Sequence, residues 1–129
     1  MNTSFTHPYR PVDLNTSMVK AFPLPSMAEK LIREATAATS NRASLTLARG
    51  DELTVVLTAM KSDTALEEHP APAAATVIML SGSIIFTTSA DRITLEQGEA
   101  VTFTADILHT VYAREDSAFL ILIGGKNSE

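Results

Sequence analysis

The chain has 129 residues, a formal net charge of −5 and no cysteine. This length fits one domain with its own hydrophobic core. The missing cysteines exclude disulfides, thiolate nucleophiles and cysteine-ligated zinc, and the negative charge argues against nucleic acid as a partner. No apolar run approaches the roughly 18 residues of a membrane span, and the N-terminus lacks the order of a signal peptide. We therefore expect a cytoplasmic protein that binds neither nucleic acid nor membrane.

The chain divides into an N-terminal part, residues 1–43, and a β-rich domain, residues 44–129. Within the first part, residues 1–25 are rich in proline and show no steady periodicity. Pro23 and Pro25 are expected to keep the end of this stretch extended, because the ring fixes φ and restricts the preceding residue. The sequence therefore predicts an extended N-terminal arm.

A short helix is predicted to follow the arm. Ser26 and Glu29 have the spacing of a capping box, in which each side chain satisfies an otherwise unpaired backbone donor. Apolar residues then follow at helical spacing, which places the helix at about residues 27–38; they are Met27, Leu31, Ala35 and Ala38. This stripe is narrow, so the helix is expected to lie on a sheet face or on a partner subunit.

From Ser44 onward, apolar and polar residues alternate with the period of β-strands. Ser81-Gly82 between two such segments predicts a hairpin turn. One strand contains Leu45 and Leu47, and the others are predicted at residues 53–60, 66–69, 76–80, 83–88, 91–95, 100–104, 108–113 and 118–123. Short strands at this spacing, without room for crossover helices, predict a β-sandwich or β-barrel.

Two predicted strands, residues 76–80 and 119–123, are apolar on both faces. One face can fill the interior, and the other must also be covered. The arm and helix could cover one sheet, and a second subunit is the other candidate. On this ground we predict a homodimer.

His69 and His109 lie far apart in the sequence, with Gly82 and Gly98 between them. If the strands roll up, both histidines can face each other across the interior, and they then mark a candidate site. The alternative is that each is a hydrogen-bonded histidine of the core.

Residues 63–113 resemble the two motifs of the cupin superfamily, whose members are jelly-roll β-barrels. His69 and Gly82 match the first motif, Gly-x5-His-x-His-x3/4-Glu-x6-Gly. Gly98 and His109 match the second, Gly-x5-Pro-x-Gly-x2-His-x3-Asn. The remaining motif positions hold Asp63, Ala71, Ala75, Thr104, Asp106 and Ala113. The resemblance implies an all-β, cupin-like jelly-roll β-barrel, here with a short N-terminal helix and an extended arm.

Metal-dependent cupins hold Fe, Mn, Ni or Zn with three histidines and a glutamate. The resemblance carries only His69 and His109 of this ligand set, because alanine at the other two positions cannot coordinate a metal. Strand alternation predicts Glu67 on the same face as His69, where it could serve as a replacement carboxylate. Asp106, just before His109, is a second candidate. A divalent metal on two histidines and one carboxylate would suit iron or manganese chemistry.

The motif positions also define a predicted ligand pocket centred on His69 and His109. Its apolar walls follow from strand alternation: Ala71, Ala75, Val77, Met79, Val111 and Ala113. Phe86, Phe103 and Phe119 are expected in the core, although any of them could line a cavity.

Three functions remain open from the sequence. The first is a small-molecule binding module without metal or with weakly held metal. The second is a metal-dependent enzyme of the dioxygenase, isomerase or decarboxylase type with an altered ligand set. The third is a metal-free enzyme in which His69 or His109 acts as the catalytic general acid or base, a role that suits an imidazole.

Overall fold

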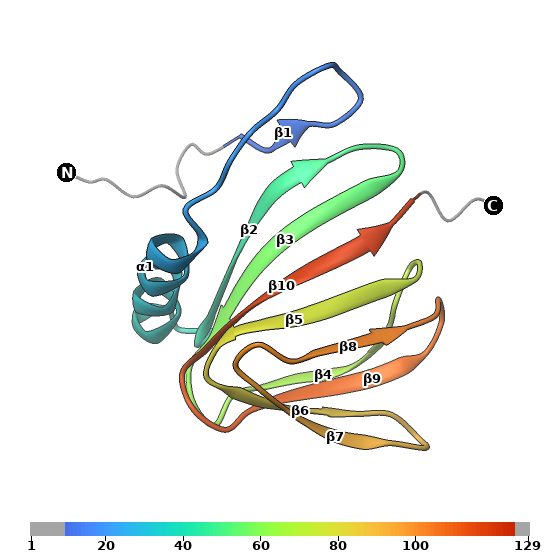
Figure 1. The fold of residues 1–129 in the computed structure, drawn as a ribbon. Coiled ribbons are helices and arrows are strands. Elements are labelled where there is room, and N and C mark those ends of the chain that lie inside the picture. The colour runs from blue at the N-terminus through green and yellow to red at the C-terminus, as the bar shows by residue number, and fades with distance from the viewer. Residues whose placement is uncertain (1–9, 126–129) are drawn as a thin grey trace.

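The computed structural model describes residues 10–125 and consists of β-strands with one helix (Figure 1). Residues 1–9 of the predicted arm lie outside this range. In chain order the elements are β1 (Val12–Asp13), α1 (Leu24–Ala37), β2 (Arg42–Arg49), β3 (Leu53–Met60), β4 (Ala65–Pro70), β5 (Ala75–Ser81), β6 (Ser83–Thr87), β7 (Arg92–Glu96), β8 (Ala100–Phe103), β9 (Leu108–Ala113) and β10 (Ser117–Gly124). All nine predicted strands are present, and β1 is an additional one.

The strands form two sheets that face each other (Figure 1). The first has six strands in the order β1-β2-β3-β10-β5-β8, and the second has four in the order β4-β9-β6-β7. All strand pairs are antiparallel except the parallel pair of β1 and β2. The predicted all-β jelly-roll class is confirmed, and the two sheets stay separate rather than closing into a barrel.

The helix begins earlier than the sequence predicted. Pro23 is its N-cap residue and makes no side-chain capping bond, so the predicted capping box is wrong. Ser26 lies inside the first turn, where its hydroxyl donates to the Pro23 carbonyl (3.1 Å). Pro25 lies in the first turn of α1 rather than in the arm. Proline is tolerated there because the backbone N–H groups of the first turn have no partner within the helix. At the other end Ala38 is the C-cap residue rather than part of the helix.

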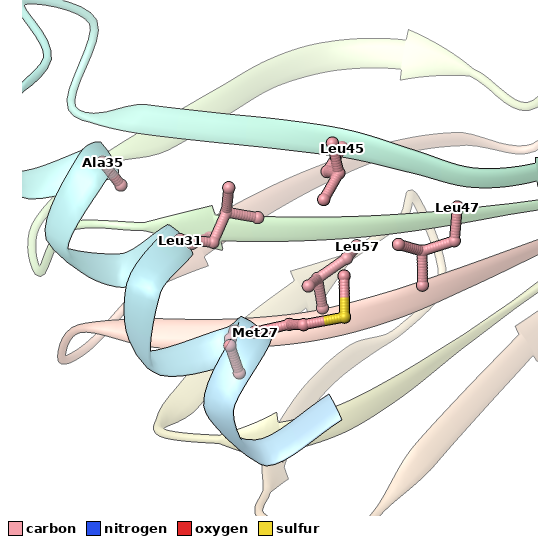
Figure 2. Packing of buried hydrophobic residues seen from close by; sticks show 9 residues of the cluster. Met27, Leu31, Ala35, Leu45, Leu47 and Leu57 are labelled. Atoms are coloured by element: carbon pink, nitrogen blue, oxygen red, sulfur yellow. The ribbon is translucent and has the colours of Figure 1, made fainter. Parts of the chain in front are cut away.

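The apolar stripe of α1 covers the outer face of the first sheet, as predicted for the helix. Figure 2 shows Met27, Leu31 and Ala35 directed at leucines of β2 and β3, among them Leu45 and Leu57. Leu31 is fully buried, and such burial contributes about 1.5–3 kcal/mol. No helix within residues 10–125 is long and apolar enough to span a bilayer. The homodimer stays a prediction.

A second apolar cluster fills the space between the two sheets. It is built from the inward-facing residues of six strands, as strand alternation predicts. Its buried members are Met60, Val77, Met79, Ile84, Phe86, Leu95, Val111, Ala113 and Phe119. The two clusters explain why β10 is apolar on both faces: Phe119 points between the sheets, while Ala118 belongs to the cluster under α1.

The Ser81-Gly82 turn is not a hairpin, which corrects the prediction. β5 belongs to the first sheet and β6 to the second, so the chain passes from one sheet to the other at Gly82. Gly82 has φ +83°, and the backbone N–H of Ser83 donates to the buried Ser117 hydroxyl (3.1 Å). We call this end of the molecule, at residues 81–83 and 116–117, the hinge end. The opposite end, at residues 88–91 and 104–107, is the open end.

All four glycine positions of the two cupin motifs have positive φ. They are Asp63 (66°), Gly82 (83°), Gly98 (86°) and Asp106 (70°). Glycine adopts this conformation without strain, and aspartate is one of the few other residues that tolerates it. The backbone therefore adopts a conformation that favours glycine at all four positions, including the two where this chain has aspartate.

Gly82 and Gly98 form a matched pair for a test of crowding at the hinge end. An added Cβ at Gly98 would meet no atom within 4 Å, so Gly98→Ala should cost only the strain of positive φ, about 1–2 kcal/mol. An added Cβ at Gly82 would collide with the Ser117 hydroxyl and the Asp116 backbone. We expect Gly82→Ala to cost at least ~3 kcal/mol in urea unfolding. Equal losses for both variants would contradict this account.

Candidate functional site

The structure brings His69 and His109 together at the open end. They occupy paired positions on the neighbouring antiparallel strands β4 and β9. Their ring centroids are 4.2 Å apart, with the rings inclined at 60°. The pairing that the sequence could only suggest is therefore present, although it runs between neighbouring strands of one sheet rather than across the interior.

The two rings have different surroundings. His109 is only 6% exposed. Its ring stacks on Phe86 at 5.1 Å and 18° and lies 4.8 Å from the ring of Phe103. His69 is exposed at the end of β4. One imidazole thus belongs to the edge of the core, and the other faces the solvent beside it.

Backbone carbonyls fix the protonation pattern of both imidazoles. Nδ1 of His69 lies 2.7 Å from the Glu67 carbonyl, and Nδ1 of His109 lies 3.0 Å from the Ile107 carbonyl. A carbonyl only accepts, so each Nδ1 carries the proton and donates it. In the neutral ring Nε2 is then an acceptor with a free lone pair. Within residues 10–125, no side chain or backbone group makes a hydrogen bond to either Nε2.

Burial lowers the pKa of His109 below its ordinary value of 6.5. The hydrogen bond to the Ile107 carbonyl acts in the opposite direction, and the nearby His69 adds a smaller lowering effect. Burial dominates because the protonated imidazole loses its water among apolar side chains. His109 is therefore a neutral imidazole near pH 7, with its proton on Nδ1.

The residues present do not fit the cupin metal set of three histidines and a glutamate. Within residues 10–125, no group of three or more His, Cys, Asp or Glu is placed to hold a metal ion. Glu67 contributes its backbone carbonyl to His69 rather than a third ligand. The pairing of β4 with β9 shifts between Leu66 and His69, which breaks the strict alternation on which the prediction for Glu67 rested. Asp106 does not complete the set either.

The predicted apolar walls lie inside the packed core. Val77, Met79, Val111 and Ala113 all belong to the cluster between the sheets. Ala71 and Ala75 are also buried, and the Ala71 carbonyl accepts the backbone N–H of Asp106 (2.9 Å). Strand alternation identified the inward direction of these side chains, but none of them lines the hollow beside His109.

A hollow of about 540 Å³ opens at the open end, and neither His69 nor His109 is among the residues that line it. Phe86 and Phe103, the two rings that flank His109, form part of its wall. Most of the remaining lining comes from the 88–91 turn and from the connection between β8 and β9, which lie at the right of Figure 1, and Glu68, Ile93, Val101 and Thr102 complete it. The sequence reading missed this hollow because it treated these segments only as connections. Their one signal was their polar composition between apolar strands.

A larger hollow of about 650 Å³ lies elsewhere, between β1 and the end of β10. Its charged lining residues, Asp13, Arg49 and Asp51, are all exposed. Within the described part of the chain, neither hollow is lined by a histidine or by a buried titratable side chain, but the larger one also has no aromatic ring in its lining, whereas the smaller one is lined by two rings that contact His109. Size alone does not identify a site, so the smaller hollow beside the buried imidazole is the better candidate.

Comparison with solved structures identifies the fold. A cupin superfamily protein from Desulfitobacterium hafniense matches with a TM-score of 0.69 and 17% identity, over 87% of this chain and 96% of that one. A conserved protein of unknown function from Streptococcus pyogenes matches with a TM-score of 0.66 and 18% identity, over 93% and 99%. The DMSP lyase from Ruegeria pomeroyi matches with a TM-score of 0.60 and 18% identity, over 65% and 47%. No protein-family model and no curated protein matches the sequence. The chain therefore has the cupin fold.

The lowered pKa of His109 predicts a pH dependence of stability. The unfolded chain takes up a proton at this residue near pH 6.5, while the folded protein takes it up only at lower pH. Proton uptake by the unfolded state therefore lowers the free energy of unfolding as the pH falls through 6.5, and the loss ends below the folded pKa. His109→Phe keeps an aromatic ring beside Phe86 and removes the titration. Urea unfolding between about pH 7.5 and 5.5 should show a steeper loss for the wild type than for this variant.

The control for this measurement is His69→Gln, which keeps His109 and its burial. Its stability should follow most of the wild-type pH dependence, because burial rather than His69 is the main cause of the lowered pKa. Parallel curves for the wild type and His109→Phe would contradict the assignment.

Proposed function

We propose that this chain, which has the cupin fold, binds a small organic molecule in the hollow beside His109. The observation that supports the proposal is a hollow whose lining includes Phe86 and Phe103, two rings that pack against each other and against the buried, neutral imidazole of His109. Apolar walls with a few placed polar groups are typical of small-molecule sites, and about 540 Å³ falls within their usual size.

The chemistry of the site favours a ligand that carries both an apolar group and a hydrogen-bond donor. The half-buried Phe103, Ile93 and Val101 offer surface for the apolar group, and the fully buried Phe86 supports them from behind. His109 lies behind these residues rather than in the lining; a ligand that reaches past them would meet its Nε2 as an acceptor whose direction is fixed by the bond from Nδ1 to the Ile107 carbonyl. Threonine and serine hydroxyls at the rim, including Thr88 and Thr104, supply further polar contacts.

General-base catalysis by His109 is the second candidate function. The favouring observation is the same imidazole, neutral near pH 7 and with Nε2 free to accept a proton. Of the structural matches named above, one is an enzyme, the DMSP lyase, but at 18% identity that likeness concerns the fold alone. A metal-dependent reaction has less support, because only two of the four ligand positions hold a possible ligand.

Binding can be tested with a fragment screen on the full chain, followed by methyl NMR. We expect hits to shift the methyl resonances of Ile93, Val101 and Ile107, which line the hollow. His109→Phe preserves ring packing and removes the Nε2 acceptor. It should weaken fragments that carry a hydrogen-bond donor about fivefold, the effect of losing one hydrogen bond.

The matched control is Arg49→Gln, which changes the larger hollow beside β1. It should leave these affinities unchanged. A screen in which Arg49→Gln weakens binding and His109→Phe does not would move the site to the other hollow. Hits that shift no methyl group of Ile93, Val101 or Ile107 would contradict the proposal.

Metal content provides a further prediction. Two histidines without a third protein ligand form a weak site, because catalytic metal sites use at least three protein ligands. Elemental analysis of protein purified without chelator or nickel resin should therefore find well below one metal per chain. Near-stoichiometric metal that disappears in the His69→Ala/His109→Ala double variant would contradict this expectation and support a rebuilt metal site.

A further inference from the structure

The charges around the hollow are of one sign. Glu68 of β4, Asp91 of the turn between β6 and β7, and Asp106 of the loop before β9 all line it. None of the lining residues in the described part of the chain is lysine or arginine. These three carboxylates come from separate segments that the fold brings to the same opening. Their summed field attracts cations to the hollow and repels anions.

The inner wall of the same hollow is aromatic and aliphatic. Phe86 and Phe103 lie 4.9 Å apart between ring centroids, and Ile93 and Val101 extend the apolar surface. Aromatic faces attract cations through the ring quadrupole, most strongly where water is excluded. The carboxylates and the half-buried ring of Phe103 therefore both favour positive charge in this hollow, while Phe86 is fully buried behind the wall.

His109 does not oppose this selection. Its ring packs against both phenylalanines, so a positive charge there would repel a bound cation. Burial holds the pKa of His109 below its ordinary value, which leaves the ring neutral near pH 7. The neutral ring therefore places no positive charge behind the wall of the hollow.

We propose that the ligand of this hollow is an organic cation, an amine or quaternary ammonium compound with an apolar group attached. The apolar group lies against Ile93 and Val101, and the cationic centre lies between the ring of Phe103 and the carboxylates of Asp91 and Asp106. This assignment rests on the proposed small-molecule site and adds the chemical class of its ligand. It excludes carboxylates and phosphate esters as preferred ligands.

The test uses three small probes of similar size that differ in charge: phenyltrimethylammonium, the neutral tert-butylbenzene, and the anionic phenylacetate. Each is titrated into the full chain while the methyl resonances of Ile93, Val101 and Ile107 are followed. We expect phenyltrimethylammonium to bind at least about fivefold more tightly than tert-butylbenzene. Phenylacetate should bind most weakly. Raising the salt concentration should reduce the preference for the cation.

Two charge-matched double variants locate the source of the preference. Asp91→Asn/Asp106→Asn removes two rim charges, and asparagine tolerates the positive φ at residue 106. It should weaken phenyltrimethylammonium about fivefold and leave tert-butylbenzene unchanged. Glu29→Gln/Glu115→Gln removes two exposed charges from α1 and from the turn before β10. It should leave all three affinities unchanged.

The outcomes separate this assignment from the proposed function. Equal or tighter binding of tert-butylbenzene or phenylacetate at the same methyl groups would overturn the cationic class and leave the small-molecule site standing. Equal weakening by both double variants would assign the preference to net charge and would also overturn it. If no probe shifts these resonances while fragments from the screen do, the cationic class fails alone. If fragments fail as well, both proposals fail.

Discussion

The passage of the chain between the two sheets at Gly82 is the constraint on which the rest of the structure depends. Gly82 joins β5 of one sheet to β6 of the other. At this crossing the buried hydroxyl of Ser117, at the start of β10, accepts a hydrogen bond from the backbone N–H of Ser83. The sheets are held closely together there and diverge toward the other end (Figure 1). Apolar side chains from both inner faces fill the middle of the wedge. A hollow remains where the sheets are farthest from the crossing, and that is where His109 lies.

His109 links the core to this hollow. Its ring extends the aromatic packing of Phe86 and Phe103, so the same contacts that stabilise the edge of the core also desolvate the imidazole. Its Nδ1 proton is donated to a backbone carbonyl, which leaves Nε2 as the acceptor of the ring. Packing and protonation are therefore coupled at one residue. His69, exposed and 4.2 Å away between ring centroids, shares the bonding pattern without the burial.

Much of the fold and part of the site could be predicted from the sequence, and the rest depends on facts that local patterns do not contain. Alternation of apolar residues located the strands and the inward direction of Val77 and Val111, but it carries no information on whether the space they face is filled. Glycine at residue 82 signals positive φ, which a hairpin and a crossing between sheets both require. The shift in the pairing of β4 with β9 near Glu67 is set by the partner strand, so alternation alone does not fix the face on which Glu67 lies. The hollow was missed because its rim comes from turns brought together by the whole fold.

The positive φ of Asp106 restricts which side chains can stand at the rim of the hollow. Aspartate, asparagine and glycine tolerate that backbone conformation, whereas β-branched and bulky residues do not. Changes at this position are therefore limited to a carboxylate, a neutral amide or no side chain at all. Variants of this chain can adjust the charge of the entrance in these few steps while the backbone beneath it stays the same. At residue 106 the charge at the rim can therefore be changed without a change in the fold, which makes this residue a natural starting point for altering which charged molecules the hollow admits.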